Sequence, residues 1–104
     1  MVAAALRVIR EEACSGISVD QVAQQVGASR SVLQRRFSNL LGQTIHDRLI
    51  DQRIKRAIEL ISNTGLPMLE IAERCGFKHQ EYMGAVFRER CGKTPREFRK
   101  HVKS

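Results

Sequence analysis

Hydrophobic residues recur along almost the whole chain at a helical spacing, and no stretch alternates for long enough to predict a β-strand. The apolar positions of the first predicted helix are Val2, Leu6, Ile9 and Ala13. This helix is expected to end near Gly16, a residue suited to the left-handed conformation. Ser18, with Gln21 three residues later, predicts the capped start of a second helix that ends at Gly27. The pattern predicts an all-α fold.

The segment from Ala28 to Leu41 predicts an amphipathic helix with a basic outer face. Its apolar stripe, expected to face the core, consists of Leu33, Phe37, Leu40 and Leu41. Ser29 is the expected N-cap. The helix carries three arginines, at positions 30, 35 and 36, and no carboxylate occurs between Asp20 and Asp47. This local charge favours contact with a polyanion.

The most informative pattern is an internal repeat of a short helix, a glycine-containing turn and a longer helix. Val22-Ala23-x-x-Val26-Gly27 recurs as Ile71-Ala72-x-x-Cys75-Gly76. Leu33, Phe37, Gly42 and Thr44 recur as Met83, Phe87, Gly92 and Thr94, with one extra residue in the second turn. The repeat predicts two tandem helix-turn-helix units.

A long helix is predicted between the units, starting at Thr44 and Asp47 and running to about Thr64. About 19 residues at ~1.5 Å each give a rod of ~28 Å. Such a rod can hold two small units about one turn of B-DNA (~34 Å) apart. A central core helix without a spacing role is the alternative. The predicted organisation is a first subdomain at 1–43, a linker helix at 44–64 and a second subdomain at 65–104, with about seven helices.

In the second unit, Pro67 is expected in the first turn of a short helix, and a longer helix is predicted from about His79 to Cys91. Thr94-Pro95-Arg96-Glu97 predicts a capping box at the start of a last helix. Gly84, inside the longer helix, indicates close approach by a neighbouring helix or by a DNA backbone, and packing is the favoured explanation.

The charge balance favours nucleic acid as the partner. The chain of 104 residues has 18 Lys plus Arg against 11 Asp plus Glu, for a formal net charge of +7. A membrane surface is the competing polyanion. No apolar run approaches the ~20 residues that span a bilayer, and the basic residues do not follow one amphipathic face. The first five residues lack the features of a signal peptide, so a cytosolic protein is expected.

Enzymatic chemistry has no support in the sequence. The three cysteines, Cys14, Cys75 and Cys91, lack C-x-x-C spacing and are expected to be small buried hydrophobic residues. His46, His79 and His101 are scattered and predict no metal site. No nucleophile elbow or glycine-rich phosphate loop occurs. We therefore expect neither catalysis nor a cofactor.

Motifs along nearly the whole chain resemble a known family. They are Gly27-x-Ser29 with Leu33-x-x-x-Phe37 and Gly42, Arg53 with Ala57 and Leu60-Ile61, Ile71-Ala72 with Gly76-Phe77, and Phe87 with Gly92-x-Thr94-Pro95-x-x-Phe98-Arg99. Together they resemble the DNA-binding domain of the AraC/XylS transcriptional regulators. The stretch from Ala5 to Ile17 is similar to the xylose-operon regulators within that family. The resemblance implies a bacterial activator or repressor whose full-length chain has a sensing or dimerisation domain, and which acts in the cytoplasm at the nucleoid.

The resemblance also implies which residues contact DNA bases. In the first recognition helix, at about 29–41, the family's base-reading positions fall on Ser31, Val32, Gln34 and Arg35. In the second, at about 79–91, the equivalent positions are His79, Gln80, Glu81, Gly84 and Ala85. Gln can pair with adenine and Arg with guanine, whereas Gly84 and Ala85 cannot donate to a base edge. We expect the second helix to make more phosphate than base contacts.

Phosphate contacts are expected mainly from basic side chains. The candidates are Arg30, Arg36, Ser38, Lys78, Arg88, Lys93, Thr94 and Arg96. For the arginines and lysines a solvated surface charge is the alternative, and the stem of Arg36 could simply cover the core. Arg53, among apolar neighbours, is expected to be a structural ion-pair partner rather than a DNA contact.

The sequence as a whole favours specific binding to double-stranded promoter or operator DNA through the major groove. The competing interpretation is a basic helical module that docks on an acidic protein such as RNA polymerase, which could also be contacted in addition to DNA. Non-specific packaging of nucleic acid lacks the exposed aromatic platform that it would need.

Overall fold

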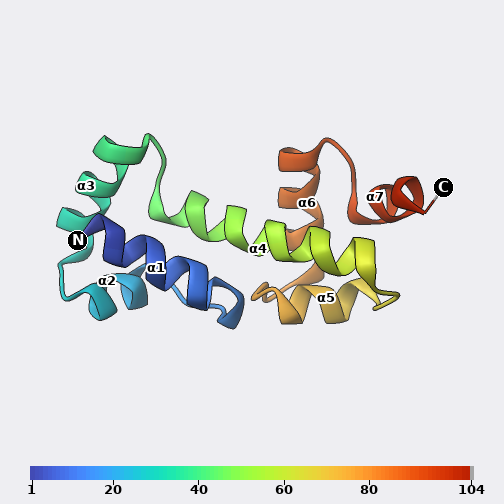
Figure 1. Ribbon diagram of the computed structural model, residues 1–104, viewed down its shortest axis with the longest axis horizontal. Helices are drawn as coiled ribbons and strands as arrows, with labels where there is room; N and C mark the ends of the chain where they lie inside the picture. Colours follow the sequence, from blue (N-terminus) through green and yellow to red (C-terminus); the bar gives the residue numbers. More distant parts are fainter. Residues whose placement is uncertain (104) are drawn as a thin grey trace.

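Every regular element in the computed structural model, which describes residues 1–103, is helical (Figure 1). Over that range the elements are α1 (Val2–Glu12), η1 (Ala13–Ser15, a 3-10 turn), α2 (Val19–Val26), α3 (Arg30–Leu41), α4 (Ile45–Asn63), α5 (Met68–Arg74), α6 (Gln80–Cys91) and α7 (Pro95–Val102). The predicted all-α fold with about seven helices is confirmed. Ser104, the last residue of the predicted second subdomain, lies outside the described residues.

Three helices begin at capping boxes, two of which the sequence predicts, at Ser18 and Thr94. The Ser18 hydroxyl accepts a hydrogen bond from the Gln21 amide at 3.1 Å, and the Gln21 side chain accepts one from the Ser18 amide at 2.8 Å. The same reciprocal pair forms at the start of α4, from Thr44, and of α7, from Thr94. Pro67 differs from expectation, because it takes an extended conformation as the N-cap of α5 instead of entering its first turn.

Two hydrophobic clusters form the core, and α4 contributes to both. The first cluster joins α1, η1, α2 and α3, here called the first unit, to the N-terminal half of α4; its largest buried side chains include Ile9, Leu33, Phe37 and Leu49. The second joins α5, α6 and α7, the second unit, to the rest of α4, with Ile61, Ile71, Met83 and Phe87 buried. Each such side chain contributes ~1.5–3 kcal/mol on burial. The long helix is therefore the shared support of two small cores.

Leu40 does not face the core, contrary to the sequence-based expectation. It is 69% exposed, whereas Leu33 and Phe37 on the same helix are fully buried. In Figure 1 the C-terminal end of α3 extends away from α1 and α4, so the last turn has no helix to pack against on that side. Leu41, also in this turn, keeps partial contact with the first cluster.

Arg53 of α4 fastens the linker helix to the first unit. Its Nε donates to the Ala13 carbonyl and its Nη2 to the Ile17 carbonyl, each at 2.7 Å, and the residue is 8% exposed. The prediction of an ion pair is therefore wrong, because the guanidinium donates to backbone oxygens and not to a carboxylate. Burial lowers the pKa of Arg53, but an arginine stays charged, and charge-assisted bonds of this kind are stronger than neutral ones.

The two units also touch each other directly. At Gly76 (φ +89°) a Cβ would lie 2.6 Å from the Ala13 carbonyl oxygen and 3.0 Å from the Gly16 nitrogen, so only glycine allows this approach. Nearby, Tyr82 of the second unit contacts the start of the linker helix, where His46 Nε2 lies 3.3 Å from the Tyr82 hydroxyl, within hydrogen-bonding distance. These contacts set the units side by side in a molecule of 45 × 22 × 20 Å.

Candidate nucleic-acid interface

The two candidate recognition helices lie on the same side of the linker helix. In Figure 1, α3 and α6 both extend upward from α4, one in each unit, while α2 and α5 lie on its opposite side. Each short helix, turn and long helix follows the predicted helix-turn-helix order, with turns at 27–29 and 75–79. The outer faces of α3 and α6 are thereby presented together.

Two arginines to which the sequence analysis assigned no structural role hold the second unit on α4. Arg90 Nε, at the end of α6, donates to Asp51 Oδ1 at 2.6 Å, and its Nη2 lies 3.8 Å from Asp47 Oδ1. The bond to Asp51 raises the pKa of Arg90. Arg99 of α7 donates to the carbonyls that end α4 and follow it, those of Ile61, Thr64 and Leu66. Arg99 is part of the family-like motif, but its carbonyl partners are non-local and leave no local pattern.

The outer face of α3 carries free cationic side chains. Ser31, Arg35 and Arg36 are exposed, and neither arginine forms a hydrogen bond or ion pair with another described residue. Gln34 is half-buried and donates through Nε2 to the Ser38 hydroxyl at 3.3 Å. Val32 is also half-buried. The guanidinium groups are thus available to an external acceptor, and the Gln34 amide keeps one of its donors and its oxygen uncommitted.

Arg30 is paired within the protein. Its Nη1 lies 3.1 Å from Asp20 Oδ1, and both side chains are more than 60% exposed, at 61% and 64%. An exposed pair of this kind contributes at most ~1 kcal/mol. Arg30 can therefore exchange Asp20 for another anion at little cost.

The outer face of α6 has smaller side chains and fewer basic residues than that of α3. Glu81 and Ala85 are exposed, Gln80 and Gly84 are half-buried, and His79 is the N-cap without a side-chain capping bond. A Cβ built at Gly84 would meet no other described part of the chain within 4 Å, apart from its chain neighbours and the adjoining backbone of α6, so the packing explanation for this glycine is wrong. The other explanation, approach of a DNA backbone, stays a prediction.

The exposed basic residues lie at the two ends of α6 and beyond it, and not along its middle. Lys78 precedes the helix, Arg88 lies in its last turn, and Lys93 and Arg96 follow it; all four are exposed. Thr94 is half-buried, and its hydroxyl accepts a hydrogen bond from the Glu97 amide at 3.2 Å. Of the eight phosphate candidates, Arg30, Ser38 and Thr94 thus have partners within the chain.

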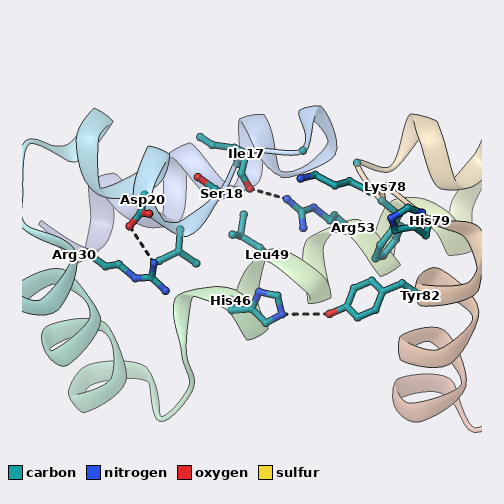
Figure 2. A pocket seen from close by; sticks show the side chains of 14 residues that line it. Ile17, Ser18, Asp20, Arg30, His46, Leu49, Arg53, Lys78, His79 and Tyr82 are labelled. Atoms are coloured by element: carbon teal, nitrogen blue, oxygen red, sulfur yellow. Dashed lines mark hydrogen bonds and ion pairs between the residues drawn. The ribbon is translucent and has the colours of Figure 1, made fainter.

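A cleft of about 440 Å³ lies between the units, and the N-terminal ends of both candidate recognition helices border it. Figure 2 shows Arg30 and Asp20 on one side, Lys78, His79 and Tyr82 on the other, and His46 and Arg53 of α4 at its floor. Asp20 is the sole carboxylate among the lining residues. The cleft is therefore suited to an anion more than to a cation.

Metal and membrane sites receive no support from the described residues. In residues 1–103 no cluster of three or more His, Cys, Asp or Glu side chains could hold a metal ion. Over the same range no helix is long and apolar enough to cross a bilayer.

Two helix-turn-helix units with a basic outer surface define a class of proteins that recognise DNA, and comparison with known proteins places the chain within it. A family model described as a helix-turn-helix domain matches residues 6–101. The xylose operon regulatory protein of Escherichia coli K12 is 40% identical over 95 residues, which are 91% of this chain and 24% of that protein.

Solved structures agree with that match. The C-terminal domain of AraT, a response regulator from Geobacillus stearothermophilus, has a TM-score of 0.90 and 31% identity, covering 96% of this chain and 84% of that one. The DNA-binding domain of the transcriptional factor AdpA, solved with a target DNA, has a TM-score of 0.91 and 27% identity, covering 98% of this chain and 92% of that one. The chain belongs to the AraC family of helix-turn-helix transcriptional regulators. It is a DNA-binding domain of that family, which is not enzymatic, and it spans about a quarter of the length of the curated relatives that it matches first.

Proposed function

We propose that this domain binds specific double-stranded DNA by placing α3 and α6 in two successive major grooves on one face of the duplex. The observation that carries the proposal is the common direction of the two helices from α4 (Figure 1). The 19 residues of α4 give a support of ~28 Å. That length suits two contacts about one turn (~34 Å) of B-DNA apart.

The first helix is the proposed base reader. Arg35 has the exposed guanidinium that can pair with O6 and N7 of a guanine, and Gln34 can pair with an adenine after releasing Ser38. Ser31 can bond to either kind of base, and Val32 offers apolar contact to a thymine methyl group. Arg36 and Ser38 flank these residues and would hold phosphates, as would Arg30 after it leaves Asp20.

The second helix is proposed to dock with fewer base contacts. His79, Gln80 and Glu81 are the candidates at its N-terminal end, and Glu81 could accept from a cytosine N4 group. The candidates for phosphate contacts here are Lys78, Arg88, Lys93, Thr94 and Arg96. Because Arg30 and Lys78 border the same cleft, the backbone between the two grooves would pass beside it.

The packing supports the division of the chain into a first unit at 1–43, a linker helix at 44–64 and a second unit at 65–104, since each unit has its own hydrophobic cluster. We further propose that the parent protein is a longer bacterial regulator that works in the cytoplasm at the nucleoid. Its other part would sense a ligand or dimerise. The groove between α5 and α7, with Leu69 exposed beside Arg96 and Lys103, favours an acidic partner such as RNA polymerase as a second contact.

Selection of bound sequences from a random duplex pool, followed by hydroxyl-radical footprinting, tests the proposal. We expect two protected patches about 10 base pairs apart on one face. Specific affinity should exceed non-specific affinity by about 10³-fold or more and fall steeply with salt. A single protected patch shorter than half a helical turn would show that only one unit binds DNA. Equal affinity for all duplexes would exclude specific recognition. Polymerase added to the same footprint should extend it at one edge if it is a partner.

A further inference from the structure

Two cysteines from different units meet at the joint between them. Cys14 lies in η1 of the first unit, and Cys75 directly follows α5 of the second. The two side chains are near enough that each thiol is the largest influence on the pKa of the other, and both residues are free thiols. The two backbones approach closely at this point, because a Cβ at the neighbouring Gly76 would lie 3.0 Å from the Cys14 carbonyl carbon.

The environment makes the two thiols unequal. The hydrogen bond from Cys75 lowers the pKa of Cys14 to about 7, against the effect of burial; Arg53 and Arg56 of α4 lower it further, and Glu59 opposes them. The same hydrogen bond and burial raise the pKa of Cys75. Cys14 is half-buried whereas Cys75 is 0% exposed. Cys14 is therefore the nucleophile that a small oxidant can reach, and Cys75 lies behind it.

We propose that Cys14 and Cys75 form an oxidation site, which a hydroperoxide converts into a disulfide joining the two helix-turn-helix units. The Cys14 thiolate attacks one peroxide oxygen, the O–O bond breaks, and Cys14 becomes a sulfenic acid as the other oxygen leaves as hydroxide or alkoxide. The Cys75 sulfur then attacks the Cys14 sulfur, the S–O bond breaks, and the Cys75 proton leaves with the departing oxygen as water. The two thiols lose two electrons in total, and the hydroperoxide gains them.

The disulfide would link the two units covalently and so restrict how α3 and α6 lie relative to each other. In the reduced protein the two units meet here at Gly76, while the hydrogen bonds of Arg53 hold the first unit on α4. A covalent link here would close a loop that contains α2, α3, α4 and α5. The relative position of α3 and α6 would then be restricted in the oxidised form.

Cys91 supplies an internal comparison. It is half-buried against the second cluster, and burial raises its pKa. No second cysteine faces it among the described residues. We expect it to react more slowly than Cys14 and to form no internal bond.

The test uses a Cys91→Ser variant, treated with hydrogen peroxide and examined by intact mass and thiol titration. We expect a monomer that has lost about 2 Da and both free thiols, with full recovery by a dithiol reductant. Adding Cys14→Ser should abolish the change. Adding Cys75→Ser should stop the reaction at a sulfenic acid that dimedone traps on Cys14. A monomer that keeps both thiols, or a product that is mainly an intermolecular dimer, would overturn the proposal.

A second measurement distinguishes the thiol pair from adventitious oxidation. The rate of Cys14 alkylation should rise through a midpoint near pH 7 in the Cys91→Ser protein, the value set by its pKa of about 7. Cys75→Ala removes the donor, so the midpoint should move to higher pH. An unchanged midpoint would contradict the hydrogen-bonded pair. Neither readout involves DNA, so a failure here is separate from a failure of the proposed DNA binding.

Discussion

The two helix-turn-helix units share one plan but expose different surfaces. Gly27 and Gly76 occupy equivalent turns, and both have positive φ angles. A Cβ at Gly27 would meet nothing within 4 Å, whereas one at Gly76 would collide with the backbone of η1. The first turn is thus an ordinary helix end, and the second has also become the joint between units. Repetition of a fold therefore does not imply repetition of a role.

The recognition helices differ in the same way. On α3, Arg35 and Arg36 face outward without a partner among the described residues. On α6, Gly84 and Ala85 occupy the positions equivalent to Gln34 and Arg35, the proposed base readers of α3, and Arg90 is engaged by Asp47 and Asp51. In the proposed mode of binding, α3 therefore offers side chains that can contact base edges, whereas α6 is held by ion pairs to α4 and offers few such side chains.

Substitution of the two equivalent glycines should give the largest contrast. Gly27→Ala adds the strain of a left-handed alanine, ~1–2 kcal/mol. Gly76→Ala adds that strain and a clash with the Ala13 carbonyl, so we expect a loss of ~3 kcal/mol or more in the free energy of unfolding. Urea unfolding of both variants measures the difference. Equal losses would mean that the backbone of η1 moves aside from the added methyl group without cost.

Much of the fold was predictable because it depends on local signals. The capping residues Ser18, Thr44 and Thr94 act within one helical turn, and the buried stripes follow the helical period. Contacts between distant segments were not predictable from such signals. Arg53 was expected to pair with a carboxylate, but it donates to the backbone carbonyls of Ala13 and Ile17, which lie 40 and 36 residues away in the sequence.

The candidate site likewise has features that local sequence patterns predicted and features that depend on contacts between helices. The spacing of exposed positions on α3 identified Arg35 correctly as an outward-facing cation. The sequence could not show that Arg30 is paired with Asp20, because that pair depends on how α2 and α3 cross. Leu40 and Gly84 were misjudged because helical periodicity gives the direction of a side chain and not whether another helix lies there.

Arg35→Ala should have the next largest effect, on DNA recognition. We expect a loss of ~1–3 kcal/mol in binding to the selected site and a relaxed preference at one or two base pairs. Selection of sequences with the variant protein, together with titration of matched and scrambled duplexes, measures both.

Arg88→Ala is the matched control for Arg35, because Arg88 is an exposed arginine in the last turn of the other helix. As a phosphate contact it should weaken all duplexes alike and reduce the salt slope by about one unit. If Arg35→Ala weakened selected and scrambled DNA by the same factor, Arg35 would also be a phosphate anchor and the contrast between α3 and α6 would fail.

Of the glycine substitutions, Gly84→Ala should change the free energy of unfolding least, and it should increase it where Gly27→Ala and Gly76→Ala decrease it. Apart from the chain neighbours and the adjoining backbone of α6, no described atom lies within 4 Å of the added methyl group, and alanine favours a helix over glycine. The free energy of unfolding should therefore rise by ~1 kcal/mol. Ala85→Gly, the reverse change at the next exposed position, should lower it by a similar amount. If DNA approaches the helix closely at Gly84, its alanine variant will bind DNA more weakly although it is more stable. Affinity that rises or stays constant in a binding titration would show that the glycine does not serve close contact with DNA.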